Sequence, residues 1–355
     1  TDTASGSLAN TATIGGGGVS DTTPGNNSAT DTDTILPLDF GDAPGSAQGS
    51  PWAYPTLVAA NGARHGVNGP GALRMGAQLD TEADGQPTLA ADGDDQVSVP
   101  NVDDEDGVTL PATLDACGSA NVAVNASAVA KLDAFVDWNR NGSFADAGEK
   151  IFDNQALTVG ANVLSFNVPC TATPTTLTFA RFRVSTAGSL PSTGVAADGE
   201  VEDYTVVVRG LDFGDAPIVY PTLLAGNGAR HIVVPGALLL GATVDTEADG
   251  QPTAGANGDD LATSDDEDGV NFTSPLIRGQ NASVTVTASA PGVLNAWLDF
   301  NGDGNWTTAG DAIFVNVALA AGANNLSFPV PATATTNLNT VARFRFASAS
   351  GLSFT

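Results

Sequence analysis

Basic residues and histidine are scarce in this chain. Its 355 residues include 12 lysines and arginines and two histidines against 40 aspartates and glutamates, so the formal net charge is −28. Such a chain repels nucleic acid and anionic membrane surfaces, and we expect neither as a partner. It also lacks an apolar run long enough to span a bilayer. Its first residues show no secretion signal, and we expect the sequence to come from inside a longer exported product.

Catalytic signatures are absent as well. The sequence has no nucleophile elbow, no phosphate-binding glycine loop and no plausible Ser/His/Asp set. His65 and His231 each follow an arginine and have no cysteine partner, so neither fits a standard zinc site. We expect each histidine to be packed and hydrogen-bonded, with Arg64 bridging carboxylates. A carboxylate pair for glycoside hydrolysis stays open, but duplication of the whole acidic set favours a scaffold, and we predict no enzyme.

The residues that are abundant are typical of strands and turns. Hydrophobic residues make up 42% of the chain, enough for packed cores, and threonine, alanine, valine, glycine and asparagine are common. Short runs such as NVAVNASAVA, TLTFARFRVS and VEDYTVVV are separated by turn residues. We predict an all-β protein of tandem antiparallel β-sandwich domains, immunoglobulin-like or jelly-roll-like, with long acidic loops that bind calcium.

An internal repeat divides the chain. The strings LDFGDAP, YPTL, NGARH, DTEADGQPT and DDEDGV occur in the same order from residue 38 and again from residue 211. Residues 38–209 therefore form the first copy and residues 210–355 the second. The second copy ends before any counterpart of DGEVEDYTVVV at 198–208, so it lacks its last strand or borrows one. Residues 1–37 lie outside the repeat and contain two predicted strands, either the tail of a preceding domain or a segment that connects subunits.

Cysteine occurs twice, at Cys117 and Cys170, both in the first copy. The second copy has Gly279 and Ala332 at the matching positions, so the pair was gained or lost together. Each cysteine lies at the end of a predicted strand, and we predict a disulfide, which indicates an oxidising, extracytoplasmic location. Two small buried thiols are the alternative.

One loop of each copy has the spacing of a calcium-binding loop. D-x-N-x-D-G at 299–304, and D-x-N-x-N-G at 137–142, place oxygens at alternate positions and glycine at the sixth. The closing acid comes at position 13 and no helix pattern flanks the loop, so neither is an EF-hand. The first copy has one carboxylate fewer and should bind more weakly, and a turn that needs no ion is the alternative. The candidate ligands are Asp299, Asn301, Asp303, Asn305 and Asp311 in the second copy and Asp137, Asn139, Asn141, Ser143 and Glu149 in the first.

A second acidic group also occurs in both copies. Of the 40 acidic residues, 19 lie in the windows 80–106 and 245–268, and consecutive acids in a folded loop are costly unless they are neutralised. So many hard oxygens suit calcium better than magnesium, and a solvated acidic loop is the alternative. The candidate ligands are Asp80, Glu82, Asp84, Asp94, Asp95, Asp103, Asp104 and Asp106 in the first copy and Asp245, Glu247, Asp249, Asp259, Asp260, Asp265, Asp266 and Asp268 in the second.

Arginines and glutamates share strand faces near the end of the first copy. Arg181 and Arg183 lie on one face of a predicted strand, and Glu200 and Glu202 lie on one face of the next long strand. We predict a cross-strand ladder of ion pairs between them. Metal ligation by Glu202 or Asp203 is the alternative.

The motifs together resemble a known family. DFGDAP, YPTL, GARH, DTEADGQP, DDEDGV, the D-x-N-x-D-G loop, ARFR and GEVEDY are similar to the GEVED domain, a module of large secreted bacterial proteins, over about nine-tenths of the chain. The strands of residues 1–37 resemble the end of the immunoglobulin-like repeat domains found in tandem in surface proteins. The resemblance implies an extracellular, repeat-built surface or adhesin-like protein, and it implies no chemistry.

These observations predict a structural protein stabilised by calcium on the bacterial cell surface. It would form part of a fibre, filament or adhesin stalk, with its own copies or neighbouring repeats as partners. Strand addition between subunits would complete the second copy. The alternative is a calcium-dependent adhesin that binds a surface glycan, which requires exposed aromatic residues such as Trp52, Trp138 or Trp306 beside the ion.

Overall fold

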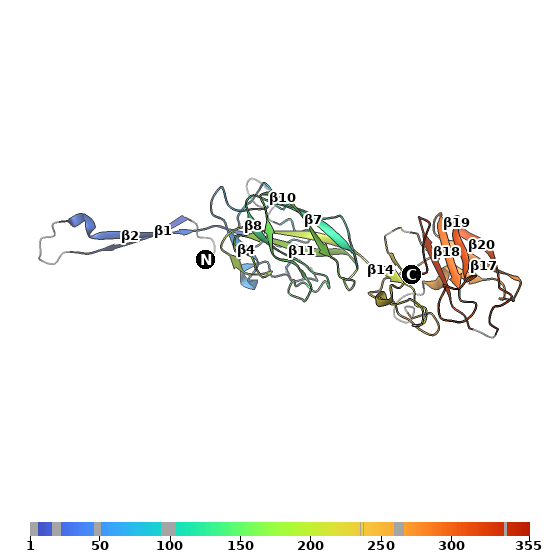
Figure 1. Ribbon diagram of the computed structural model, residues 1–355. Coiled ribbons are helices and arrows are strands. Elements are labelled where there is room, and N and C mark those ends of the chain that lie inside the picture. Colours follow the sequence, from blue (N-terminus) through green and yellow to red (C-terminus); the bar gives the residue numbers. More distant parts are fainter. Residues whose placement is uncertain are drawn as a thin grey trace. The chain divides into compact units, whose positions relative to one another are not determined.

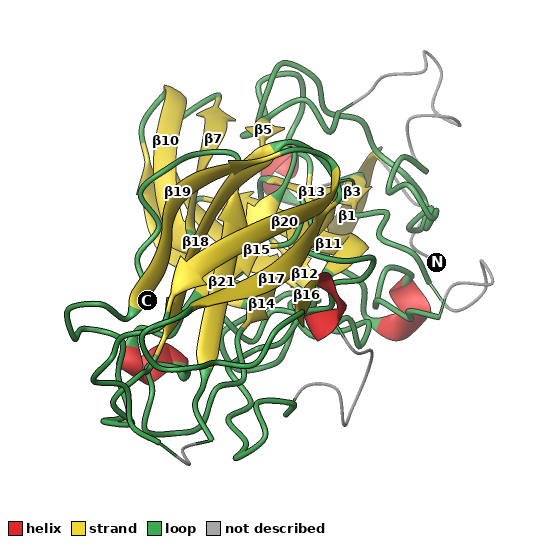
Figure 2. Ribbon diagram, turned by 90° about the vertical axis from the view of Figure 1, so that its right-hand side faces the viewer, coloured by secondary structure: helices red, strands yellow, loops and turns green. Residues whose placement is uncertain are grey.

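The protein is built almost entirely from strands, turns and loops, which confirms the all-β prediction (Figure 2). The computed structural model describes residues 6–15, 23–45, 51–93, 104–234, 236, 238–258, 266–336 and 339–355. The helical elements in these ranges are the 3-10 turns η1 (Pro24–Asn26), η3 (Val58–Ala60), η5 (Leu224–Gly226) and η6 (Glu267–Gly269). No helix within them has the length and apolar character needed to span a membrane.

The chain folds as two compact units. Unit 1 comprises Thr1–Pro169 and Thr176–Val208, and unit 2 comprises Cys170–Thr175 and Arg209–Thr355. The strands up to the boundary are β1 (Gly6–Thr13), β2 (Ser28–Ile35), β3 (Leu38–Phe40), β4 (Arg64–Gly66), β5 (Val108–Thr109), β6 (Leu114–Asp115), β7 (Ser119–Ala126), β8 (Ala130–Val136), β9 (Lys150–Leu157), β10 (Gly160–Asn167), β11 (Thr175–Ser185), β12 (Val195–Ala196) and β13 (Glu200–Arg209). The strands after it are β14 (Leu211–Phe213), β15 (Arg230–Ile232), β16 (Val270–Phe272), β17 (Asn281–Ala288), β18 (Gly292–Leu298), β19 (Ala312–Leu319), β20 (Gly322–Pro329) and β21 (Ala342–Ala347).

Unit 1 has a five-stranded sheet and a three-stranded sheet. Their strand orders are β6-β13-β11-β8-β9 and β10-β7-β5, and Figure 1 shows β7, β8, β10 and β11 lying together. The buried residues of β7 are Val122, Val124 and Ala126, at every second position, because successive side chains of a strand point to opposite faces. A small third sheet, β12-β4-β3, includes one parallel pairing, between Val195 and Arg64.

Unit 2 repeats this arrangement with fewer strands. Its sheets are β16-β17-β20, β19-β18-β21 and the pair β14-β15. Val284 and Val286 of β17 pack in one core cluster with Leu294 and Leu298 of β18 and with Phe346 of β21. Burying each such side chain contributes about 1.5–3 kcal/mol. Two sheets that share one core form a sandwich, as the sequence predicts.

Cys117 and Cys170 are disulfide-bonded. They flank β7 and β10, which pair antiparallel from Gly160 opposite Ala126 to Asn167 opposite Ser119. The strand register therefore brings the two cysteines together just beyond the last pair. Cys117 adopts a left-handed backbone conformation with φ of 61°.

The two predicted strands of residues 1–37 are present as an antiparallel hairpin. β1 pairs with β2 from Gly6 opposite Ile35 to Thr13 opposite Ser28, and every residue of β2 is exposed. A two-stranded hairpin with no buried face is marginally stable on its own. Its assignment to an immunoglobulin-like domain stays a prediction.

Candidate functional site

Asp137 organises the acidic loop that follows β8. Its carboxylate is buried, and Oδ1 accepts the backbone N–H groups of Arg140 at 2.6 Å and Asn141 at 3.3 Å. Oδ2 accepts the N–H of Gly142 at 2.9 Å and the hydroxyl of Tyr54 at 2.5 Å. The first residue of the predicted calcium loop thus fixes a tight turn with protein donors alone.

The closing acid of this loop is also bonded to the backbone. Glu149 is buried, and its two oxygens accept the N–H groups of Trp138 at 3.2 Å and Asp146 at 3.1 Å. The pKa of Glu149 is raised to about 7, chiefly by burial and also by the charges of Asp137 and Asp146, which together outweigh the lowering effect of these bonds. Three carboxylates therefore act on one another in the loop of the first copy.

Asp146 is a loop residue that sequence reasoning missed. Its Oδ2 accepts the side-chain amides of Asn139 at 3.2 Å and Asn141 at 2.7 Å. Ser143 receives a bond from the Ala145 N–H and donates its own backbone N–H to the side-chain oxygen of Asn141. The repeat gave no signal for Asp146, because the second copy has threonine there.

The loop of the second copy has the same frame. Asp299 accepts the N–H groups of Gly302 at 2.7 Å and Gly304 at 3.0 Å, and the Tyr220 hydroxyl at 2.8 Å. The Asn301 amide donates to Asp303 at 2.8 Å. The aspartate that opens the loop therefore has the same role in both copies.

The closing acid of the second copy differs from Glu149. Asp311 is buried, and its Oδ1 accepts the Phe300 N–H at 3.3 Å. Its Oδ2 is buried without a hydrogen-bond partner among the described residues. Burial is the largest cause that raises the pKa of Asp311, and the charges of Asp299 and Asp303 act in the same direction. An orphaned buried oxygen of this kind costs about 1–3 kcal/mol unless a donor or a cation satisfies it.

Most acids of the second acidic group bind separate backbone N–H groups. Glu82 accepts from Phe40 at 3.1 Å and Asp84 from Val58 at 2.7 Å. In unit 2, Glu247 accepts from Phe213 at 2.9 Å and Asp249 from Leu224 at 2.6 Å, and Asp106 and Asp268 accept from Ala77 and Ala242. Loop segments with few strand pairings need such acceptors, since buried N–H groups must be bonded. Each of these six acids therefore ties a loop to a different backbone segment.

Asp80 and Glu200 are the exceptions in unit 1. Both carboxylate oxygens of Asp80 and Oε1 of Glu200 are buried without a hydrogen-bond partner in the described structure. The Asp80 N–H donates to Asp104 at 3.1 Å. Burial raises the pKa of Glu200 well above its ordinary value, and Glu202, Asp39 and Asp104 raise it further. Several buried carboxylates thus lie close enough to repel one another.

Across the described residues, no group of three or more histidine, cysteine, aspartate or glutamate side chains is arranged to hold a metal ion. Six predicted ligands lie outside the described residues: Asp94, Asp95, Asp103, Asp259, Asp260 and Asp265. Amide and backbone oxygens also bind calcium, so the loops that open with Asp137 and Asp299 stay candidate sites by donor chemistry.

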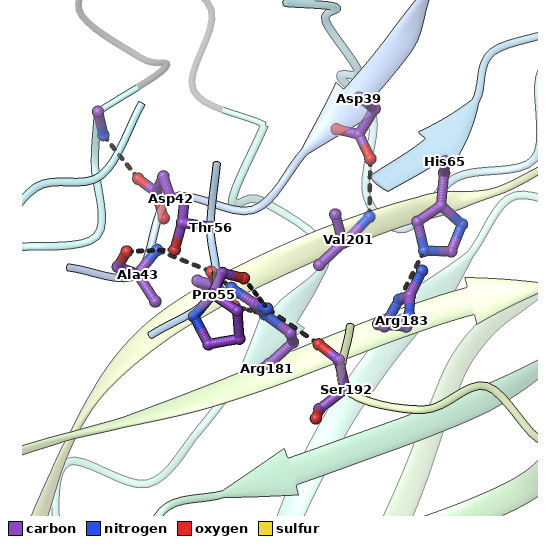
Figure 3. Close-up of polar contacts among 12 residues, drawn as sticks. Asp39, Asp42, Ala43, Pro55, Thr56, His65, Arg181, Arg183, Ser192 and Val201 are labelled. Carbon is purple, nitrogen blue, oxygen red and sulfur yellow. Dashed lines mark hydrogen bonds and ion pairs between the residues drawn. The ribbon is translucent and has the colours of Figure 1, made fainter. Parts of the chain in front are cut away.

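A buried arginine holds the last strand of unit 1. Arg181 and Asp203 are both fully buried and make two bonds of 2.7 Å, from Nε to Oδ1 and from Nη2 to Oδ2. Nη1 donates to the carbonyl oxygens of Pro55 at 3.3 Å and Ser192 at 3.0 Å (Figure 3). The predicted ladder between Arg181 and the glutamates is therefore wrong: Asp203 is the partner, and Glu202 accepts the Gly107 N–H at 3.0 Å.

The neighbouring arginine binds a histidine. Arg183 donates from Nε to Nε2 of His65 at 3.0 Å (Figure 3). Nδ1 of His65 is 2.7 Å from the Asp198 carbonyl oxygen. These partners require neutral imidazole with its proton on Nδ1. His65 is packed and hydrogen-bonded as predicted, whereas Arg64 binds Asn61 and the Gly62 carbonyl oxygen and bridges no carboxylate in the structure described.

His65 should make unit 1 sensitive to acid. Burial lowers its pKa well below 6.5, and the Arg183 charge lowers it further. The unfolded chain then takes up a proton below pH 6.5 that the folded chain refuses, so stability falls as pH falls. In the parent, the free energy of unfolding should fall by up to about 1.4 kcal/mol per pH unit below pH 6.5. We expect His65→Gln to abolish this fall. Urea unfolding of both proteins at pH 7.5, 6.5 and 5.5 measures this, and a stability difference that is constant with pH would contradict it.

Residues 131–207 and 293–354 match the family model of the GEVED domain. A search of the curated proteins finds no match. Among solved structures, the chain is similar to the secreted serine protease VesC from Vibrio cholerae, with 14% identity and a TM-score of 0.18, over 68% of this chain and 51% of that one. The chain thus spans about half the length of that structure, and a similarity of this size carries no argument.

Proposed function

We propose that this chain, which contains two copies of the GEVED domain, is a calcium-stabilised structural module of a bacterial surface protein. The GEVED domain is not known as a family of enzymes. The all-β architecture and the disulfide are compatible with an extracellular protein. The proposal of calcium rests on one observation, the buried carboxylate oxygens that lack a protein donor.

Calcium fits the chemistry of these oxygens. Asp80 and Glu200 in unit 1, and Asp311 in unit 2, leave hard, negatively charged atoms buried without a hydrogen bond among the described residues, in a chain of net charge −28. A bound calcium ion would supply the positive charge that these carboxylates lack. Asp80 and Glu200 would supply ligands in unit 1, and Asp311 with Asp303 would supply them in unit 2, each together with amide and backbone oxygens.

The two D-x-N-x loops should differ in affinity. All the oxygens of Asp137 and Glu149 already accept protein hydrogen bonds, and position five is asparagine. The second copy has a carboxylate at that position, Asp303, and the orphaned oxygen of Asp311. We therefore infer that the loop of unit 2 binds calcium more tightly than the loop of unit 1.

Calcium should raise the melting temperature of both units. Extracellular calcium modules bind with dissociation constants of about 10⁻⁴–10⁻³ M. At 10 mM calcium each site then contributes about 1.4–2.7 kcal/mol, because the ion binds the folded state alone. Differential scanning calorimetry with calcium, with magnesium, with sodium chloride at equal ionic strength and with chelator measures this. Equal stabilisation by sodium chloride would mean charge screening and would refute the calcium proposal.

Two matched double variants locate the effect in unit 1. Asp80→Asn with Glu200→Gln replaces both acids of the proposed site, and should reduce the calcium response of unit 1 to that of its weaker loop while leaving the response of unit 2 unchanged. Asp31→Asn with Asp33→Asn removes two acids from the exposed strand β2 and should change neither response. In chelator, the first variant should be at least as stable as the parent, because it no longer buries carboxylate oxygens without a hydrogen bond. A response of unit 1 equal to that of the parent would exclude these residues from the site.

We also propose that the module assembles with other copies or neighbouring repeats into a fibre, filament or stalk. The side of β21 that no strand of the described residues covers supports this, since unpaired backbone groups favour addition of a further strand. The hairpin β1–β2, exposed along β2, offers a second pairing surface.

Binding of glycan is the weaker alternative. It requires aromatic side chains that face solvent beside the ion, but Trp52, Trp138 and Trp306 are 8%, 4% and 2% exposed. Trp138 and Trp306 also donate their indole N–H groups to the carbonyl oxygens of Gly148 and Val341. These side chains pack the loops onto the sandwich, which favours the structural role.

A further inference from the structure

The sheet of unit 2 has an open edge where unit 1 has a strand. In unit 1, β13 lies between β6 and β11. β21 repeats the A-R-F-R sequence of β11, but within the described part of unit 2 it has β18 alone as a neighbour. The backbone groups on the other side of β21 can therefore pair with a further extended segment.

A groove of about 670 Å³ lies along this edge. Its lining can be compared with residues that bind β13 in unit 1 through side-chain hydrogen bonds or an ion pair. These are Asp39, Ala43, Met75, Gly107, Val108 and Arg181. The counterparts of all six line the groove, and they are Asp212, Ala216, Leu240, Gly269, Val270 and Arg343. The groove is thus the place that β13 fills in unit 1.

Arg343 is the residue most affected by the open edge. It is 6% exposed, and no carboxylate pairs with it among the described residues. Its Nη1 donates to the carbonyl oxygens of Pro221 at 2.8 Å and Phe354 at 2.7 Å, as Nη1 of Arg181 does to the matching carbonyls. Nη2 has a long contact of 3.5 Å with the Thr222 hydroxyl.

The remaining edge of the Arg343 guanidinium faces a space shaped for a carboxylate. A Cβ placed on Gly214 would lie 3.5 Å from Nη2 and 3.7 Å from Nε of Arg343. In unit 1 the same construction on Gly41 falls 2.6 Å from Oδ2 of Asp203. In unit 1 the carboxylate of Asp203 occupies the space beside Gly41. In unit 2 no carboxylate of the described residues occupies the matching space beside Gly214.

We propose that this groove binds an extended segment with the chemistry of β13. The segment carries glutamate, any residue, glutamate, aspartate and an aromatic residue in that order, followed by threonine and three valines, as at 200–208. Its aspartate pairs with Arg343, its backbone pairs with β21, and its second glutamate accepts the Gly269 N–H.

The hairpin β1–β2 of a second copy fits the groove less well. Asp31 and Asp33 alternate along β2, so both side chains lie on one face of the strand. Glu202 and Asp203 are adjacent and serve opposite faces, one binding Gly107 and the other Arg181. A hairpin strand can supply one of these contacts at a time.

A peptide of residues 198–209 tests the proposal on the full chain. We expect saturable binding of one peptide per chain by calorimetry. Hydrogen exchange should slow at Ala342–Ala347, because the peptide covers the exposed side of β21. A scrambled peptide of the same composition controls for charge, and it should not bind a chain of net charge −28. No binding, or protection outside β21 and the groove, would overturn the proposal.

Paired substitutions then test the ion pair. Arg343→Met in the chain and Asp203→Asn in the peptide should each weaken binding at least tenfold, and together they should weaken it little further. Binding that is insensitive to Arg343→Met, with β21 still folded by hydrogen exchange, would also overturn the proposal. So would a peptide of residues 26–37 that protects β21 better, which would make the hairpin of a second copy the occupant. The same titration in chelator separates this proposal from the calcium proposal, because the groove needs no ion.

Discussion

Asp203→Ala is expected to destabilise unit 1 by about 3–5 kcal/mol, the range found when one partner of a buried ion pair is removed. The variant leaves the Arg181 guanidinium fully buried with no carboxylate. It also leaves the Ala43 N–H, which donates to Oδ2 of Asp203 at 2.8 Å, without its acceptor. Urea unfolding followed by tryptophan fluorescence, with the two units resolved as separate transitions, measures the loss.

The repeat provides a matched control for this prediction. Arg181→Met leaves Asp203 buried and unpaired and should cost as much as Asp203→Ala. Arg343→Met removes a buried cation that has no carboxylate partner in the described structure, together with its carbonyl bonds and its contact of 4.5 Å with the Trp306 ring. We expect it to cost less than half as much. Equal losses in the two units would show that the ion pair adds nothing to the carbonyl contacts.

The sequence predicted the sandwich because its strands follow a simple period. Val122, Val124 and Ala126 are buried at every second position of β7, and Ala282, Val284, Val286 and Ala288 alternate with polar residues in β17. Period-two burial depends on neighbouring residues alone. Comparison of the copies also identified the two cysteines that are bonded, since both are replaced together in the second copy.

The partners of the acids could not be predicted in the same way. Glu82 binds an N–H group 42 residues away and Asp84 one 26 residues away, and D-T-E-A-D-G contains nothing that specifies such contacts. Its spacing predicts convergent ligands only if the loop turns around one centre, whereas Glu82 and Asp84 accept hydrogen bonds from different segments.

The partner of Arg181 shows a related limit. Glu202 and Asp203 are one residue apart and point to opposite faces of β13. A shift of one residue in the register of the strand would therefore change which of them contacts the arginine. The orientation of β13 depends on how the loops of unit 1 cover the sheet. On the face opposite Arg181, the N–H groups of Met75 and Gly107 donate to the two glutamates. A pattern of alternating residues identifies two faces but not which face meets which neighbour.

Gly279→Cys with Ala332→Cys is expected to form a disulfide in unit 2 and to stabilise it by about 2–4 kcal/mol. A Cβ built on Gly279 lies 3.9 Å from the Ala332 Cβ, close to the separation of about 3.8 Å found in disulfides. Cross-linking a loop of this length lowers the entropy of the unfolded chain, which raises the free energy of the unfolded state by about 4 kcal/mol. Gly279 has φ of 70°, where a side chain costs about 1–2 kcal/mol, and Cys117 adopts φ of 61° in the natural bond.

The natural bond between Cys117 and Cys170 is the internal control for this variant. Reduction with dithiothreitol should break it in the parent and the variant alike and destabilise both by the same amount. The variant alone should lose further stability on reduction, in the unfolding transition of unit 2. Mass spectrometry of proteolytic fragments checks that the two introduced cysteines pair with each other, and Gly279→Cys alone measures the backbone strain. If the bond forms correctly but the stability of unit 2 does not change, backbone strain in the folded state offsets the entropy that the unfolded chain has lost.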